Sequence, residues 1–215
     1  MERRIATLVA LSLVTSCSRS PRTVLESQTS DQCYSALAAE GVRFERVPAE
    51  RAAGIDAPIV LSGDIHGIRV FGGKQDAKAN YLDCRLALAL VEWAPLLQQK
   101  GVAGLQHYSM YRADATIGSS NKTSGHARGR AIDVGSFELR DGRRLSVLEQ
   151  WKNRKRGAPP CEVASSSDAE ALMRDLACEA IEREIFQTVI TPHYNDAHAN
   201  HVHLEIGAPE AEWVR

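Results

Sequence analysis

Four of the chain's seven histidines lie within the eleven residues from His193 to His203, and the last two form an H-x-H pair, His201 and His203. In an extended segment, side chains two residues apart point to the same face, so both imidazoles can reach one point in space. Upstream, His126 and Asp133 lie seven residues apart in SGHARGRAID. Three imidazole or carboxylate ligands with an open fourth position are typical of a catalytic zinc site. We therefore expect His126, Asp133 and His203 to hold Zn²⁺ for metal-assisted hydrolysis.

The chemistry of such a site follows from the metal. Zinc lowers the pKa of its bound water to near neutrality and polarises a scissile carbonyl. A nearby imidazole suits both proton transfers at neutral pH. Arg112, if it lies in the cleft, would stabilise an oxyanion or hold a terminal carboxylate; its alternative role is a solvated arginine at a strand end. Glu205 is expected either to orient His203 or to face solvent.

Helical patterns supply the expected framework. Apolar residues recur at helical spacing from about Asn80 to Lys100, and Gly101 ends the run as a C′ residue would. A second amphipathic helix is expected over Asp168–Phe186, with Ser167 or Asp168 at its N-cap. A shorter helix is expected in the basic stretch 142–156, anchored by three apolar residues, Leu145, Leu148 and Trp151.

Strand patterns complete the fold prediction. Strands are expected over residues 102–113, over residues 127–139, which include Asp133, and over His201–Ile206. Two further runs, Ala57–Leu61 and Gly67–Phe71, could pair as a hairpin. Helices and short strands without regular β-α alternation indicate an α+β domain, with a small antiparallel sheet flanked by helices. The remaining histidines are expected in structural or surface positions (His107 and His193) or in a turn (His66).

The N-terminus has the pattern of an export signal. Two arginines precede an apolar run that is too short to span a bilayer. The residues VTSC at 14–17 resemble a bacterial lipobox, with lipid attached to Cys17; the alternative is a secretory signal cleaved nearby without lipidation. Ser18 after the cysteine favours the outer membrane in Gram-negative bacteria. We expect a signal peptide over residues 1–17, a flexible tether over 18–32 and one domain over 33–215.

Composition and net charge limit the classes of binding partner that we expect. The chain is 44% hydrophobic and 25% charged, as in soluble globular proteins. Its net charge of −1 and pI of about 6.7 supply no electrostatic reason to expect nucleic acid or an anionic membrane as a partner.

The cysteines other than Cys17 are even in number, which suggests two disulfides in an exported chain, among three possible connectivities. The preferred pairing is Cys33–Cys84 and Cys161–Cys178, because the second would close a short serine-rich loop that has little else to hold it. The chain has no C-x-x-C motif, which argues against a cysteine-based zinc site.

The motif S-x-H-x-x-G-x-A-x-D at 124–133, with H-x-H at 201–203, resembles the zinc metallopeptidase group of lysostaphin-type enzymes, D-alanyl-D-alanine peptidases and hedgehog domains. More narrowly, SGHARGRAIDVGSFELRDG and TPHYNDAHANHVHLEI are similar to the bacterial extensin-like C-terminal domain family, over about Cys33 to Ile206. The resemblance implies a hedgehog-like or D-Ala-D-Ala-peptidase-like zinc site in which His126, Asp133 and His203 match the ligands.

The same resemblance implies roles for other residues. His201 matches a histidine that acts on the metal-bound water or stabilises the transition state, and His198 is similar to an additional active-site histidine of murein endopeptidases. SMYR at 109–112 resembles the S-G-Y-R stretch of D-alanyl-D-alanine carboxypeptidases, in which Arg112 would face the substrate carboxylate or the oxyanion. Many of these peptidases have a glutamate base where this chain has Asn200, so any base must be His201 or His198.

These features favour a monomeric zinc-dependent hydrolase of peptidoglycan peptides, a D-Ala-type carboxypeptidase or endopeptidase. We expect it on the periplasmic side of the envelope, held to the membrane by lipid on Cys17. The alternative is a non-catalytic zinc-containing module that binds wall peptides or a protein. Such a module would need the three ligands, whereas an enzyme would also need His201 and His198. A plain structural protein would leave the histidine cluster unexplained.

Overall fold

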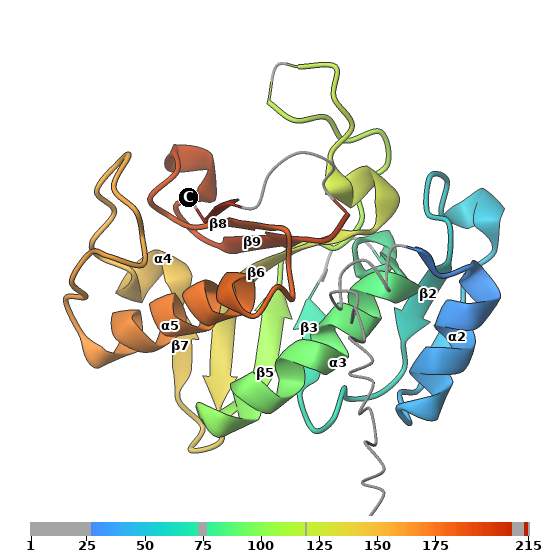
Figure 1. The fold of residues 1–215 in the computed structure, drawn as a ribbon, viewed down its shortest axis with the longest axis horizontal. Coiled ribbons are helices and arrows are strands. Elements are labelled where there is room, and N and C mark those ends of the chain that lie inside the picture. The colour runs from blue at the N-terminus through green and yellow to red at the C-terminus, as the bar shows by residue number, and fades with distance from the viewer. Residues whose placement is uncertain (1–26, 73–76, 119, 208–212, 215) are drawn as a thin grey trace, which may run out of the picture.

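The computed structural model describes residues 27–72, 77–118, 120–207 and 213–214 (Figure 1). The expected signal peptide, the Cys17 lipid site and most of the tether lie outside these residues. The described α-helices are α2 (Ser30–Ala39), α3 (Cys84–Gln99), α4 (Val147–Gln150) and α5 (Asp168–Glu182). Short 3₁₀ helices are η1 (Ala49–Arg51), η2 (Ala77–Asn80), η3 (Gly125–Arg128) and η4 (Asp196–His198). The strands are β1 (Phe44–Arg46), β2 (Pro58–Leu61), β3 (Arg69–Gly72), β4 (Leu82–Asp83), β5 (Val102–His107), β6 (Ala131–Leu139), β7 (Arg144–Ser146), β8 (Thr188–Ile190), β9 (Val202–Glu205) and β10 (Trp213–Val214).

The strands form two sheets. The larger has seven strands in the order β10-β8-β9-β6-β5-β3, with β7 also paired to β6, and the smaller has the order β1-β2-β4. Helices α3 and α5 lie across one face of the larger sheet (Figure 1). The α+β class is confirmed. The expected small antiparallel sheet is wrong in one respect, because β3 pairs with β5 and β10 with β8 in parallel. Both parallel pairs bring a strand to the sheet from a distant part of the chain.

The predicted hairpin does not form, although both of its strands do. β2 pairs with β1 and β4 in the small sheet, and β3 pairs with β5 in the large one. Between them, Ile65 and Ile68 bridge each other across a tight turn with positive φ at His66 (46°) and Gly67 (75°). Both isoleucines are 1% exposed, so the turn is anchored in the core and the strands diverge into different sheets. His66 lies in this turn, as expected.

Helix α3 is the predicted core helix. It begins after Asp83, whose carboxylate accepts a hydrogen bond from the Arg85 backbone N–H at 2.9 Å, as an N-cap residue does. Residues 80–83, which the periodicity assigned to the helix, instead end η2 and form β4. Gly101 follows the helix with φ 78°, the left-handed conformation expected at C′.

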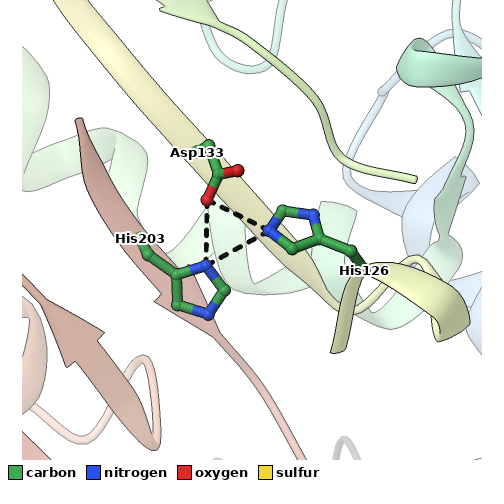
Figure 2. Close-up of side chains that lie close together, drawn as sticks. All are labelled: His126, Asp133 and His203. Atoms are coloured by element: carbon green, nitrogen blue, oxygen red, sulfur yellow. Dashed lines mark hydrogen bonds and ion pairs between the residues drawn. The ribbon is translucent and has the colours of Figure 1, made fainter. Parts of the chain in front are cut away.

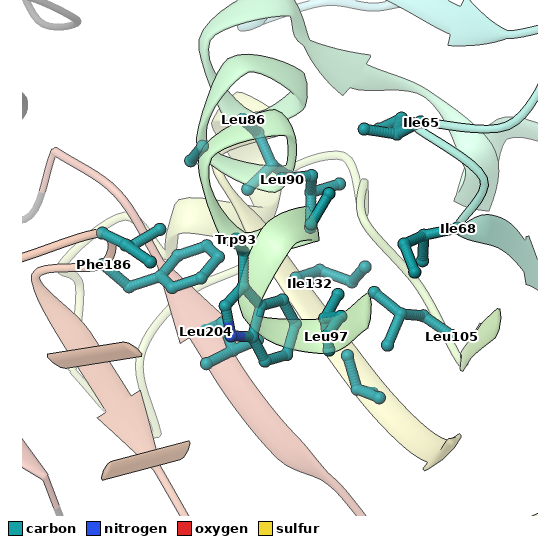
Figure 3. Packing of buried hydrophobic residues seen from close by; sticks show 14 of the residues in the cluster. Ile65, Ile68, Leu86, Leu90, Trp93, Leu97, Leu105, Ile132, Phe186 and Leu204 are labelled. Atoms are coloured by element: carbon teal, nitrogen blue, oxygen red, sulfur yellow. The ribbon is translucent and has the colours of Figure 1, made fainter. Parts of the chain in front are cut away.

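The core lies between α3 and the large sheet (Figure 3). Trp93 of α3 is fully buried and contacts the rings of Phe137 on β6 and Phe186 before β8 edge to face, with ring centroids 6.3 and 5.6 Å apart. Burial of one large apolar side chain stabilises a fold by roughly 1.5–3 kcal/mol, and aromatic contacts add to this. The packing therefore holds α3 against β6, the strand that contains Asp133.

Helix α5 begins at Ser167, whose hydroxyl accepts from the Glu170 N–H, as predicted. It ends earlier than expected, in a Schellman motif: Glu184 has φ 59°, and the N–H groups of Glu184 and Ile185 donate to the carbonyls of Ile181 and Ala180.

Helix α4 lies in the basic stretch, as expected, but one of its three predicted anchors is wrong. Leu145 and Trp151 are buried, whereas Leu148 is 51% exposed and Val147 is buried in its place. The preceding strand β7 fixes where the helix starts and therefore which of its residues face inward. Helix α2 and strands β1, β4, β7, β8 and β10 were not predicted.

Both preferred disulfides are confirmed. Cys33–Cys84 joins α2 to the start of α3, and Cys161–Cys178 joins the loop before α5 to that helix. Disulfides persist in oxidising compartments, which indicates that the domain functions outside the cytoplasm. Among the residues described, no helix is both long and apolar enough to cross a membrane.

Candidate metal centre

Two of the three predicted metal ligands lie opposite each other in the large sheet. Asp133 on β6 and His203 on β9 are directly paired in the antiparallel register, so their side chains share a face. His126 comes from η3, which begins with Ser124 as N-cap and ends at Gly129 in the left-handed conformation, with φ 62°. This short turn brings His126 back over the strand pair (Figure 2).

The three donor atoms form a compact triangle. His126 Nε2 lies 3.0 Å from Asp133 Oδ1 and 3.2 Å from His203 Nδ1, and the last two atoms are 2.9 Å apart. Ligands about 2.0–2.1 Å from a tetrahedral zinc lie about 3.3 Å from one another, so these separations are close to one face of such a tetrahedron. The residues are 1%, 2% and 6% exposed, and together they form a group able to hold a metal ion.

The outer nitrogen of each imidazole has an acceptor partner. His126 Nδ1 donates to the Met110 carbonyl oxygen at 3.3 Å, and His203 Nε2 donates to Glu205 Oε2 at 3.1 Å. A carbonyl or carboxylate oxygen can only accept, so each ring turns its N–H outward and its other nitrogen toward Asp133. Three electron-pair donors then meet at one point, an arrangement that could hold a metal ion.

Glu205 therefore faces His203 rather than solvent, which resolves the two alternatives for this residue. Its side chain passes over Gly125, where an added Cβ would lie 2.4 Å from the Glu205 carboxyl carbon. The glycine next to His126 thus makes room for the carboxylate. Hydrogen bonds of this kind orient metal-binding histidines and set their tautomers.

The electrostatics of the centre also favour a cation. Burial acts to raise the pKa of Asp133, but hydrogen bonds with His126 and His203 outweigh it and hold that pKa well below its usual range. Burial acts to lower the pKa of His203, but the carboxylates of Asp133 and Glu205 raise it to about 9. Burial lowers the pKa of His126. Without metal, one proton therefore resides on His203, and a metal ion would replace it.

Two further histidines border this centre. His201 Nε2 lies 3.4 Å from Asp133 Oδ1, and the His198 ring centroid lies 5.0 Å from that of His201 and 6.2 Å from that of His203. Their Nδ1 atoms lie beside the side-chain oxygens of Asn200 (2.8 Å, His201) and Asn195 (2.7 Å, His198). Burial lowers the pKa of both rings, to about 4 for His198. At neutral pH both imidazoles are neutral, and because an amide oxygen can only accept, each N–H is on Nδ1 and Nε2 is the proton-accepting nitrogen.

Arg112 reaches the centre from the loop after β5. Its Nη1 lies 3.3 Å from Asp133 Oδ2, the oxygen not used by the histidines, and its side chain is 53% exposed. The backbone N–H of Arg112 donates to the His126 carbonyl at 3.1 Å. The guanidinium therefore lies between the buried carboxylate and solvent.

Two of the remaining histidines, His193 and His107, lie in the protein interior, whereas His66 is exposed in its turn. His193 is 1% exposed, and its Nδ1 lies 3.1 Å from the Lys155 carbonyl oxygen. His107 is 2% exposed and pairs with the core residue Val134; neither of its nitrogens has a partner among the described residues. It borders a cavity of about 260 Å³ that Met110 also lines.

Gly129, the C-cap of η3, is required by the packing of this turn against β4. A Cβ at Gly129 would lie 2.7 Å from the Asp83 backbone nitrogen and 2.8 Å from Ile55 Cδ1. Close packing of η3 against β4, together with the positive φ, therefore requires this glycine. Its effect on the centre is indirect, because it fixes the turn that positions His126.

Sequence reasoning missed two contributors to the centre. The Met110 carbonyl has no side-chain signal at all. Tyr108 is 48% exposed, and its ring contacts that of His201 edge to face, with centroids 6.1 Å apart. Its place directly before the SMYR stretch was the only hint available in the sequence.

Comparison with known proteins identifies the family of this chain. The model of the family described as "Extensin-like protein C-terminus" matches residues 31–213, which include every residue of the candidate centre. The chain therefore belongs to the extensin-like C-terminal domain family. A search of curated proteins found no match.

Proposed function

We propose that this member of the extensin-like C-terminal domain family is a zinc-dependent hydrolase of peptidoglycan peptide bonds, a D-Ala-type carboxypeptidase or endopeptidase. The observation that carries the proposal is the convergence of three inward-facing donor atoms with two neutral imidazoles beside them. A site that only held a metal would need the first group and not the second. The spacing of His126 Nε2, Asp133 Oδ1 and His203 Nδ1 supports a tetrahedral ion.

Zinc suits this donor set better than the harder divalent ions. Two imidazoles and one carboxylate are common zinc ligands, whereas magnesium and calcium prefer oxygen ligands alone. Cysteines do not compete, since the four in the described residues are all in disulfides. When bound, the ion supplies Lewis acidity and lowers the pKa of water at the open position.

The protein's own groups would perform the remaining steps. His201, with Nε2 3.4 Å from Asp133 Oδ1, is the candidate for taking a proton from the attacking water and returning it to the leaving amine. His198 is next to it and can share this role. Arg112, partly open to solvent, would hold a substrate carboxylate or the developing oxyanion. Glu205 would keep His203 in the tautomer that presents Nδ1.

The location of the domain supports this choice of substrate. The disulfides indicate an oxidising compartment, and the peptidoglycan of bacteria is found there. We propose that Cys17 is lipidated and holds the protein as a monomer at the outer membrane, on its periplasmic side. Mass spectrometry of the native protein should then find an N-terminus at Cys17 with added acyl mass.

A second candidate is a zinc-containing module that binds wall peptides or a protein without turnover. The observation that favours it is Asn200, which occupies the place of the glutamate base in many related peptidases. In this case His201 would have no proton to move. Wild type would then cleave no wall peptide, and His201→Ala would leave peptide binding unchanged.

The deciding experiment is digestion of purified sacculi with zinc-loaded protein, followed by mass spectrometry of the muropeptides. Wild type should release cleaved peptides. His201→Ala should keep its zinc and lose hydrolysis by roughly 10²–10⁴-fold, the usual contribution of general acid–base catalysis. His203→Ala should lose both metal and hydrolysis. If wild type binds wall peptides but cleaves none, the binding-module candidate replaces the peptidase.

A further inference from the structure

Tyr108 is one of the few large apolar side chains left exposed in the described residues, and it lies beside the metal centre. Its ring is 48% exposed. Its backbone N–H donates to the Asp133 carbonyl at 2.9 Å, and the Asp133 N–H donates to the carbonyl of the next residue, Ser109, at 3.1 Å. The backbone of Tyr108 is therefore held directly against the backbone of the central ligand.

A glycine on the neighbouring strand β6, Gly135, leaves room for this ring. Gly135 lies two residues after Asp133 on β6, so the two positions share a face of the sheet. A Cβ at Gly135 would lie 2.7 Å from Cζ, 2.8 Å from Cε2 and 3.0 Å from Oη of Tyr108. The ring thus lies across the strand at the point where any other residue would displace it.

The far side of the ring meets His201. The two ring planes are at 89°, with centroids 6.1 Å apart. Tyr108 directly after β5, Gly135 on β6 and His201 directly before β9 therefore lie next to one another. Asp133 and His203 lie close by, paired across β6 and β9. The exposed ring of Tyr108 borders the centre on the side of the candidate proton-transfer group.

We propose that the Tyr108 ring is a wall of the substrate cleft, on which the residue next to the scissile bond packs its aliphatic side chain or peptide plane. This inference rests on the proposed peptidase function. Aromatic rings provide such contact area with little loss of conformational freedom, since only two side-chain torsions are fixed. The contact is made by the ring, so the hydroxyl is not required. Tyr108 is a positioning residue, and Gly135 acts through it.

The test compares four variants of the zinc-loaded protein on a disaccharide pentapeptide purified from sacculi. Tyr108→Ala and Gly135→Ala should each raise KM by up to about tenfold with unchanged zinc content, because a lost aromatic contact is worth roughly 0.5–1.5 kcal/mol. Gly135→Ala leaves every side chain of the centre in place and displaces only the exposed ring. Tyr108→Phe should behave as wild type. Leu148→Ala on α4 is the control, since Leu148 is 51% exposed like Tyr108 but belongs to no part of the centre.

The double variant Tyr108→Ala/Gly135→Ala should have the KM of either single variant, since both remove the same contact. Wild-type KM in Tyr108→Ala, with hydrolysis intact, would overturn this inference and leave the proposed function standing. A Tyr108→Phe variant as impaired as Tyr108→Ala would also overturn it, because the hydroxyl would then carry the effect. If wild type neither binds nor cleaves the pentapeptide, the proposed function fails and this inference fails with it.

Discussion

The hydrogen bond from His203 to Glu205 provides a direct test of the metal centre that does not depend on catalysis. The two side chains are 8% and 16% exposed, and His203 Nε2 lies 3.1 Å from Glu205 Oε2. Glu205→Ala removes the only acceptor for that N–H among the residues that the structure describes. Partners of this kind typically contribute 10–100-fold to metal affinity, so the zinc Kd should rise by that factor, about 1.4–2.7 kcal/mol.

Two further variants distinguish the contribution of the Glu205 charge to zinc affinity from that of its position. Glu205→Gln keeps an oxygen that accepts from His203 but removes the charge, so its loss should be smaller than that of Glu205→Ala. Gly125→Ala keeps the carboxylate but places a Cβ 2.4 Å from its carbon, so Glu205 must move and affinity should fall. Glu138→Gln is the control, a partly exposed carboxylate on the same strand as Asp133 that pairs with Arg69.

Zinc affinity is measured by competition with a chromophoric chelator at fixed pH. Circular dichroism of the metal-free variants verifies that each one is folded. If Glu205→Ala binds zinc as tightly as Glu138→Gln, then His203 does not depend on Glu205 for its orientation. The assignment of His203 Nδ1 as the inward-facing ligand atom would then be refuted.

Four other predictions address protonation and stability. In the metal-free protein the pKa of His203 is about 9 and that of Asp133 is well below its usual range. Zinc binding at pH 7 should therefore release about one proton, from His203. Calorimetry in buffers of different ionisation enthalpy measures this number. The raised pKa of His203 stabilises the metal-free fold, and this stabilisation is complete below the pKa of an unfolded-state histidine, near 6.5. The Tm of the metal-free protein should therefore fall as pH rises toward 9. His203→Gln should abolish that fall. Trp93→Ala should lower the free energy of unfolding in urea by roughly 3–5 kcal/mol, because Trp93 is fully buried against two aromatic rings, whereas exposed Leu148→Ala should change it little. Serine replacement of Cys161 and Cys178, which are 17 residues apart, should lower the free energy of unfolding by about 3 kcal/mol through loop entropy. Replacement of Cys33 and Cys84, 51 residues apart, should lower it by about 4 kcal/mol. Equal losses, or none, in urea titrations would contradict this.

Local periodicity predicted the parts of the fold whose signals are contained in short stretches. For α3, the apolar residues that the helix buries and the Gly101 that follows it can be read from the sequence. For α5, the N-cap Ser167 can be read in the same way. Helix α2 was missed, although its capping box of Thr29 and Gln32 is a local signal. Polar composition before Cys33 suggested a tether and outweighed that signal.

Long-range pairing was not predictable in the same way. The strands β2 and β3 were located, but whether they pair with each other depends on the buried turn at Ile65 and Ile68 and on which sheet accepts each edge. Leu148 illustrates the same limit, because strand β7 sets the start of α4 and turns that side chain to solvent. Hydrophobic pattern alone does not encode which strand becomes the neighbour.

By itself the sequence determined the donor chemistry of the centre, since residue type and the H-x-H spacing identify imidazole and carboxylate groups that can converge on one ion. Only the tertiary structure decided how they converge. Strand register pairs Asp133 with His203, and the turn at Gly129 brings His126 to them. Gly125 and Gly135 leave space for Glu205 and Tyr108. These contacts join segments that are far apart in the chain. Such contacts depend on packing and strand pairing across the whole domain, whereas ligand type is a property of each residue alone.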